Sequence, residues 1–333
     1  MSSKHPRRRA VLTVAASALI LCALLALASR IVAPKNNQAE FGQIDAEAHG
    51  VLGEPEDSID VLVLGDSEAY CAFSPLQLWG EQGITSYVCA TSGQPLPYTR
   101  SLLTQALGRQ HPRVVVLETN CLFRSFTPGY ALLRGAQDLF PVLEYHNRWK
   151  SLRAEDVTSA PRATWSDEYK GHKVKTDVAA ADDTGYMAPT ESVAEIPILN
   201  YWYVQDIARI CRDNGAELLL VSTPSTKNWN MARHERTAEL AHELGAAYLD
   251  LNWQDTRVAI DWRLDTCDAG DHLNERGAQK TTHALGEALR AGFDVPDHRG
   301  DADFATWDDA CTRYRRQVDA IVWPDAAAPD ASA

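Results

Sequence analysis

The chain has 333 residues, of which 45% are hydrophobic and 23% are charged, a composition that supports a buried core and excludes a disordered or low-complexity chain. Its formal net charge is −13, with no basic patch beyond the first nine residues. A strongly acidic surface repels phosphate backbones, so we expect no nucleic-acid partner. The length fits one α/β domain of about 200 to 250 residues with extensions.

The N-terminus has the pattern of a membrane anchor. Cationic residues at positions 4 and 7–9 precede an apolar run over residues 10–28, which as a helix would be about 28 Å long, close to the thickness of a bilayer core. Cations before the run place the N-terminus in the cytoplasm and everything after residue 30 outside. A cleaved signal peptide is the alternative, although signal cores usually have about 7 to 15 apolar residues. We expect a single-pass protein of the cell membrane, with residues 1–30 as N-terminus and anchor.

The segment after the anchor, residues 31–56, is polar and acidic and contains Pro and Gly, which predicts an extracytoplasmic stalk. Six of the seven cysteines follow the apolar run, so an oxidising compartment would permit up to three disulfides. A bridge between Cys267 and Cys311 is favoured, because it would tie the C-terminal extension, residues 296–333, to a loop. Buried free thiols are the alternative for the others.

Five short apolar runs predict strands buried on both faces of a parallel sheet. They span residues 59–64, 84–89, 113–118, 217–222 and 246–251. Amphipathic helical patterns fall between or after them, over residues 98–110, 198–213, 231–244 and 275–291. This alternation predicts a doubly wound α/β domain over residues 57–295. The irregular stretch 122–197 is expected to be an insertion over one end of the sheet.

The polar residues most indicative of a functional site lie where the first three predicted strands end. Ser67 follows the first strand in the segment Gly-Asp-Ser-Glu, which would hold its hydroxyl at a strand-to-helix turn, a nucleophile's position. A helix cap is the alternative for a lone serine there. Gly93 and Asn120 end the next two strands and can supply hydrogen-bond donors to an oxyanion, although each alone suits a turn or a cap. Because ligands bind at the carboxyl ends of parallel strands, their recurrence indicates one site.

An acidic loop before the last predicted helix supplies a candidate base. It reads Asp-Ala-Gly-Asp-His-Leu-Asn over residues 268–274, so His272 has two nearby carboxylates, Asp268 and Asp271. A carboxylate fixes the tautomer of a histidine that acts as general base toward a serine. Asp271 is adjacent and would tend to point elsewhere, whereas Asp268 reaches the imidazole if the loop bulges by one residue. We favour Asp268 and keep both as candidates.

The segments Gly65-Asp66-Ser67, Gly93, Asn120 and His272 follow one another in an order that resembles the four blocks of the SGNH/GDSL hydrolases. The resemblance spans about residues 58–292 and implies a flavodoxin-like three-layer α/β/α fold with a parallel sheet of about five strands. It also implies a serine nucleophile, an oxyanion hole formed by the Ser67 backbone, Gly93 and Asn120, and neither metal nor cofactor. The pattern resembles the membrane-anchored cell-wall members, such as accessory proteins of lipoteichoic acid D-alanylation.

These observations predict an extracytoplasmic serine esterase or acyltransferase. Its expected substrates are acyl esters, above all acetyl esters, of cell-wall or secreted polysaccharide, attacked through an acyl-serine intermediate. One alternative is a non-catalytic carbohydrate-binding or assembly protein of the cell envelope with a degenerate site. Another is an accessory transferase that works only beside a membrane acyltransferase.

Overall fold

The computed structural model describes residues 6–322, which divide into two compact units. Unit 1 consists of the chain up to Ile44 together with Thr127–Ala163. Unit 2 consists of Asp45–Phe126 and the chain from Thr164 onward. The boundaries therefore fall inside the predicted stalk and inside the predicted insertion.

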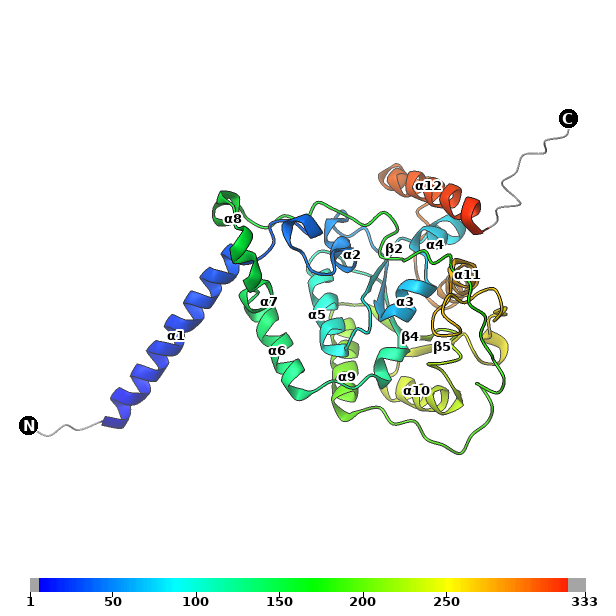
Figure 1. The fold of residues 1–333 in the computed structure, drawn as a ribbon, viewed down its shortest axis with the longest axis horizontal. Coiled ribbons are helices and arrows are strands. Elements are labelled where there is room, and N and C mark those ends of the chain that lie inside the picture. The colour runs from blue at the N-terminus through cyan, green and yellow to red at the C-terminus, as the bar shows by residue number, and fades with distance from the viewer. Residues whose placement is uncertain (1–5, 323–333) are drawn as a thin grey trace, which may run out of the picture. The chain divides into compact units, whose positions relative to one another are not determined.

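Unit 2 is built on one parallel sheet of five strands (Figure 1). The strands are β1 (Val61–Gly65), β2 (Ser86–Ala90), β3 (Val114–Glu118), β4 (Glu217–Ser222) and β5 (Ala247–Asp250), in the order β2-β1-β3-β4-β5. Each lies within one or two residues of its predicted run. The chain places β2 on one side of β1 and β3 to β5 on the other, so the winding direction reverses beside β1.

Helices cover both faces of this sheet and confirm the predicted three-layer α/β/α architecture. Successive strand residues point to opposite faces, so Leu62 and Leu64 enter one core while Val61 and Val63 enter the other. The first core includes residues of α5 (Leu96–Ala106) and α9 (Ile198–Asp213), and the second includes residues of α3 (Ser67–Ala72) and α11 (Glu275–Gly292). The remaining elements of unit 2 are α2 (Ala46–His49), η2 (Gly50–Gly53), α4 (Pro75–Gln82), η3 (Thr119–Phe123), α10 (Met231–Leu244), η5 (Gln254–Thr256), η6 (Ala302–Phe304) and α12 (Ala305–Val322).

Two segments predicted as extensions belong to the core of unit 2. Part of the predicted stalk forms α2 and η2, where Ala48 and Val51 are buried. In the predicted C-terminal extension, α12 packs Trp307 against Trp79, with ring centroids 5.6 Å apart. Apolar side chains recur along these segments and are buried against helices that cover the sheet. The segments were predicted to be extensions because their average composition is polar. Residues 323–333 lie outside the described part of the chain.

Unit 1 contains a candidate membrane span and most of the helical part of the insertion. Within α1 (Pro6–Val32), an 18-residue window of Arg8–Val32 has a mean hydropathy of 2.6 and no buried residue, so this helix is long and apolar enough to cross a membrane. The insertion, predicted to be irregular, forms helices up to residue 158 and has no helix or strand over residues 159–197. The insertion contacts the C-terminal end of α1, where the N–H of Val142 donates to Ser29 Oγ at 3.1 Å. The other elements are η1 (Ala39–Phe41), α6 (Pro128–Leu139), α7 (Val142–Tyr145), η4 (His146–Ser151) and α8 (Ala154–Thr158).

The seven cysteines are all free, so the predicted bridge between Cys267 and Cys311 is wrong. Cys311 is buried on α12, where its sulfur packs near Gly80 of α4. The sulfur of Cys267 instead faces the loop carbonyls of His272 and Leu273, each at 3.7 Å. The two thiols are used as packing groups of different elements.

Gly65, the last residue of β1, allows β3 and α3 to pack closely against that strand. A Cβ at this position would stand 2.7 Å from the Cβ of Glu118 and 2.9 Å from that of Ala69. We expect Gly65→Ala to lower the free energy of unfolding by about 1 to 3 kcal/mol, because an overpacked strand end must shift. Thermal unfolding of the full chain in detergent micelles, followed by circular dichroism, measures this change.

Gly135→Ala on α6 is the matched control. A Cβ there meets no atom within 4 Å, and alanine favours a helix interior by about 1 kcal/mol over glycine. An equal loss of stability in both variants would contradict the packing explanation.

Candidate active site

The site lies at the carboxyl ends of β1 and β3, where the winding of the sheet reverses. These strands are neighbours, with Leu64 opposite Leu117. The chain leaves β1 into α3 on one face of the sheet, whereas after β3 it returns through α9 on the other face. Strand ends beside such diverging connections are the usual ligand position in this class of fold.

Ser67 is the first residue of α3, directly after β1. Asp66 caps the helix, and its Oδ1 accepts the N–H of Glu68 at 3.0 Å. The capping role, which was the alternative reading of Ser67, is therefore filled by its neighbour. The backbone N–H of Ser67 lies in the first turn, where helix donors point outward with the positive end of the helix dipole.

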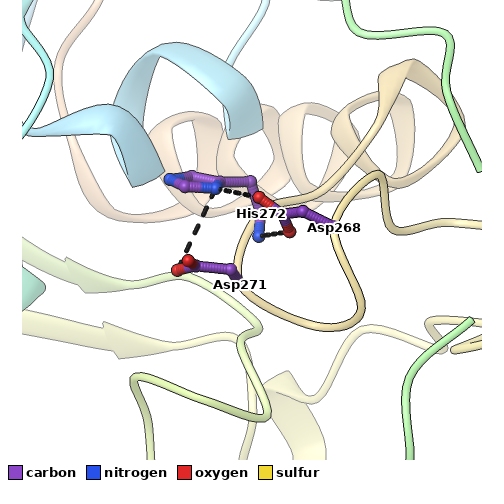
Figure 2. A group of neighbouring side chains, drawn as sticks. All are labelled: Asp268, Asp271 and His272. Carbon is purple, nitrogen blue, oxygen red and sulfur yellow. Dashed lines mark hydrogen bonds and ion pairs between the residues drawn. The ribbon is translucent and has the colours of Figure 1, made fainter. Parts of the chain in front are cut away.

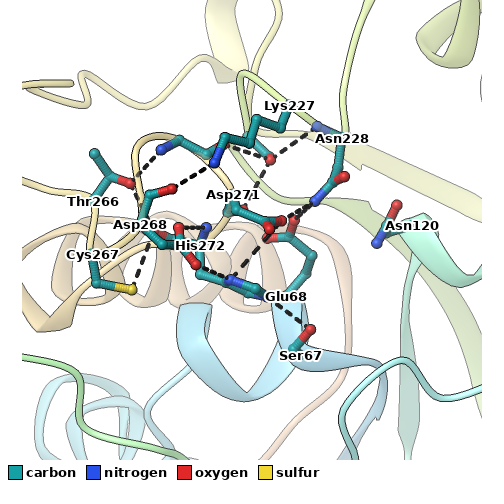
Figure 3. Close-up of polar contacts among 12 residues, drawn as sticks. Ser67, Glu68, Asn120, Lys227, Asn228, Thr266, Cys267, Asp268, Asp271 and His272 are labelled. Atoms are coloured by element: carbon teal, nitrogen blue, oxygen red, sulfur yellow. Dashed lines mark hydrogen bonds and ion pairs between the residues drawn. The ribbon is translucent and has the colours of Figure 1, made fainter. Parts of the chain in front are cut away.

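His272 connects Ser67 to a carboxylate (Figure 3). Its Nε2 lies 2.8 Å from Ser67 Oγ, and its Nδ1 lies 2.5 Å from Oδ2 of Asp268. The other oxygen of Asp268 accepts the backbone N–H of His272 at 2.6 Å, so the carboxylate holds both the ring and the chain. Burial acts to raise the pKa of Asp268, but hydrogen bonds from the side chain and backbone of His272 outweigh it and lower the pKa below its usual value. Asp268 is thus an ionised partner for an imidazolium.

A bulge in the loop brings Asp268 within reach of the ring. Ala269 has φ 59° and Gly270 has φ 92°, so two consecutive residues are left-handed. This conformation is unfavourable for alanine and is held by tertiary contacts. Thr266 Oγ1 donates to the His272 carbonyl at 2.9 Å, and buried Ser225 donates its hydroxyl to the Gly270 carbonyl at 2.9 Å. The loop therefore absorbs one extra residue between the acid and the base.

Asp271 belongs to a neighbouring network. Its Oδ1 lies 3.9 Å from His272 Nδ1, beyond hydrogen-bond distance. The same oxygen accepts from Asn228 Nδ2 at 2.5 Å, and this nitrogen also donates to Glu68 Oε1 at 2.7 Å. Asp271 and Glu68 are therefore positioned through Asn228 and not through the base (Figure 3).

Asn120 is oriented by its hydrogen-bond partners. Its Nδ2 donates to Asp66 Oδ2 at 3.0 Å, and its Oδ1 accepts from Arg233 at 3.2 Å. Because a carboxylate only accepts and a guanidinium only donates, these contacts fix which end of the amide is the donor. The second hydrogen of Nδ2 is then available to an oxyanion. Gly93, with φ 61°, lies beside the guanidinium of Arg124, whose nearest nitrogen is 3.5 Å from where a Gly93 Cβ would stand.

Tyr70 is a site residue that the sequence analysis missed. It follows Ser67 by three residues on α3, so the two share one helix face. Its hydroxyl interacts with the side chains of Ser67 and Ser92. Burial, helped by the nearby Cys71, raises the pKa of Tyr70, which keeps the phenol protonated and able to donate. The spacing of one helical turn from the nucleophile was the available signal.

Three buried carboxyl groups lie close to Ser67 at the start of α3. Asp66, Glu68 and Glu118 are at most 2% exposed, and burial is the largest cause that raises the pKa of each. Mutual repulsion adds to it, and Glu118 Oε2 has no hydrogen-bond partner among the described residues. Burial also lowers the pKa of Arg233, which these carboxylates act to raise. A protonated Glu68 or Glu118 relieves this crowding.

Asp268, Asp271 and His272 are also residue types that bind metal ions, and their ligand atoms lie within 4.8 Å of one another (Figure 2). Those atoms are already engaged in hydrogen bonds: Asp268 with His272, and Asp271 with Asn228. An ion between them would have to replace these contacts and take Nδ1 from its carboxylate. The arrangement suits an acid–base pair better than a tetrahedral ligand set.

No family model and no curated protein matches the sequence. Solved structures with a similar fold include a protein described as a lipolytic protein of the G-D-S-L family from Desulfitobacterium hafniense (12% identity, TM-score 0.38, 69% of this chain and 98% of that chain). An acylhydrolase from Bacteroides fragilis has 9% identity and a TM-score of 0.39 over 74% of this chain and 95% of its own. An acetylxylan esterase from Geobacillus stearothermophilus, solved as a catalytic mutant, has 12% identity and a TM-score of 0.32 over 72% and 96%.

The buried Glu68 should make stability depend on pH. Its pKa in the folded chain is well above the value of about 4.3 expected when unfolded, so between these values the folded state binds more protons and stability falls as pH rises. In this pH range ionisation of Glu68 lowers the free energy of unfolding by about 1.4 kcal/mol for each pH unit, and Glu68→Gln should remove this decrease. Unfolding midpoints in micelles at about pH 6 and pH 8 should therefore differ less in Glu68→Gln than in the wild type.

Glu239→Gln, at an exposed position on α10, is the control and should leave the wild-type pH dependence unchanged. A Glu68→Gln protein with undiminished pH dependence would show that Glu68 is ionised in the folded chain.

Proposed function

We propose that this protein is a serine esterase or O-acyltransferase of the SGNH/GDSL type that acts on acyl esters, above all acetyl esters, of cell-envelope or secreted polysaccharide. The observation that carries the proposal is the continuous line from Asp268 through His272 to Ser67, with contacts of 2.5 and 2.8 Å. This is the geometry in which an imidazole removes a serine proton while a carboxylate stabilises the resulting charge.

The reaction follows from these positions. His272 Nε2 takes the proton of Ser67 as Oγ attacks the ester carbonyl, and the oxyanion receives hydrogen bonds from the Ser67 N–H, Gly93 and Asn120 Nδ2. The carbon–oxygen bond to the leaving alcohol breaks, and His272 returns the proton to that alcohol. Water or a sugar hydroxyl then attacks the acyl-serine and gives its proton to His272, which returns it to Ser67 Oγ as the bond between that oxygen and the acyl group breaks. Hydrolysis and transfer thus use one set of groups.

The proposed location is the extracytoplasmic side of the cell membrane. The apolar helix α1 supplies a span, and the cations that precede it favour a cytoplasmic N-terminus. A retained anchor also favours work beside a membrane acyltransferase that delivers the acyl group. A degenerate, non-catalytic site is less well supported. Its main argument is the unusual spacing between Asp268 and His272, but the bulged loop brings these two side chains into contact.

Ser67→Ala and His272→Ala should each abolish hydrolysis of p-nitrophenyl acetate by the full chain in micelles. Loss of a triad member leaves only the oxyanion hole and binding, so we expect kcat to fall by about 1,000-fold or more. Unchanged circular dichroism confirms that each variant is folded. A wild-type chain that releases no nitrophenol, alone or with membranes, would overturn the esterase proposal, and residual turnover in Ser67→Ala would overturn the role of Ser67.

Substitution of the two candidate acids should lower kcat by clearly different amounts. Asp268→Asn removes the anion that faces Nδ1 and favours the wrong tautomer, so we expect kcat to fall by about 1,000- to 10,000-fold. Asp271→Asn alters a carboxylate 3.9 Å from the ring, and we expect a loss of no more than about tenfold. Steady-state kinetics of the pair decide between them. Equal losses would mean that both carboxylates support the imidazolium.

A further inference from the structure

Arg124 presents a partly unused guanidinium beside the oxyanion hole. One of its nitrogens lies 3.4 Å from Asp66 Oδ2, and another lies 3.5 Å from where a Gly93 Cβ would stand. Its side chain is 47% exposed although Asp66 is fully buried. The group therefore borders both the nucleophile's helix cap and the predicted oxyanion donor, and still faces solvent.

The need to neutralise Asp66 does not account for this position. Both oxygens of Asp66 have shorter partners, the Glu68 N–H and Asn120 Nδ2, each at 3.0 Å. A guanidinium dedicated to a carboxylate usually makes two parallel bonds of about 2.8 Å, whereas Arg124 makes one long contact. Among the described residues, most of its five donors have no other protein partner.

The backbone that carries Arg124 is rigid. Buried Asn200 of α9 donates its Nδ2 to the carbonyls of Cys121, Leu122 and Arg124, at 3.2, 2.9 and 2.9 Å. One side chain thus fastens the whole turn that follows Asn120. A fixed backbone lowers the ordering cost of binding, which is what a specificity residue requires.

Further cations contact residues close to Ser67 and His272, in a chain whose net charge is −13. Arg233 contacts Asn120, exposed Lys227 donates to the Asp268 carbonyl at 2.6 Å, and Lys173 lies 4.7 Å from the ring of Tyr70. The distant acidic surface is screened beyond about 8 Å at physiological salt, so charges close to Arg124 contribute most to the potential that an anion meets there.

We propose that the ester substrate carries an anionic group, a carboxylate or a phosphate, close to its acylated hydroxyl, and that Arg124 binds this group. The guanidinium fork matches the paired oxygens of either anion. That the bound molecule is a substrate rests on the proposed function, which this inference deepens. Binding of the anion itself requires no turnover.

Binding is tested with three methyl glycosides that differ only at carbon 6: galactose, galacturonate and galactose 6-phosphate. Titrations followed by nuclear magnetic resonance should show at least one anionic sugar binding about tenfold more tightly than galactose, and the stronger of the two identifies the anion. Arg124→Gln should remove this preference and Arg124→Lys should keep part of it. Arg209→Gln, which alters an exposed arginine of α9 paired with Asp206 and Asp213, should keep all of it.

The O-acetylated forms of the same sugars test turnover. The wild type should show a higher kcat/KM for the anionic ester than for the neutral ester, and Arg124→Gln should bring the ratio of these two values close to one. Equal binding of the three sugars, or a preference that survives Arg124→Gln, overturns the inference even if the enzyme is an esterase. An Arg124-dependent preference for the anion in a chain that hydrolyses no ester supports the binding site and removes the proposed function.

Discussion

The hydrogen bond between His272 Nδ1 and Asp268 is the contact on which the site depends. It fixes the tautomer that leaves Nε2 facing Ser67, 2.8 Å away. The chain obtains it only by placing Ala269 and Gly270 in left-handed conformations, since the acid stands four residues before the base. Ser225 and Thr266 hold the bent loop by its carbonyls, so a strained segment is retained by contacts from outside it.

Burial and charge around the nucleophile oppose one another. Asp66, Glu68 and Glu118 are taken out of water, which raises the pKa of each, and Arg233 is buried among them with a lowered pKa. Hydrogen bonds of Asn120 link Asp66 to Arg233, and those of Asn228 link Glu68 to Asp271 in the loop before α11. Cationic side chains that contact Asn120, Asp268 and Tyr70 offset the charge of these acidic groups, and Arg124 lies beside Gly93.

A buried polar cluster elsewhere in unit 2 connects α12 to the helices next to Ser67 and His272. Glu275, the first residue of α11 after the catalytic loop, is 1% exposed and accepts from buried Tyr314 of α12. Its other oxygen lies 2.8 Å from His172, whose second ring nitrogen contacts the Tyr70 carbonyl at 2.9 Å. A C-terminal helix that is distant in sequence is therefore joined through one polar cluster to the helices that carry Ser67 and follow His272.

The sequence by itself determined the sheet and the strand ends, because a parallel sheet buried on both faces leaves uninterrupted apolar runs and the polar residues that follow them share one edge. Helices at 198–213 and 231–244 were predicted to the residue, since Gly215 and Gly245 stand just beyond their ends. Only the tertiary structure decided which aspartate meets His272, because a one-residue bulge depends on contacts with Ser225, far away in the chain. Only it placed α12 in the core, left the cysteines unpaired, and brought Asn228 to Glu68 and Arg124 to Asp66, since these contacts join segments that are far apart in the sequence.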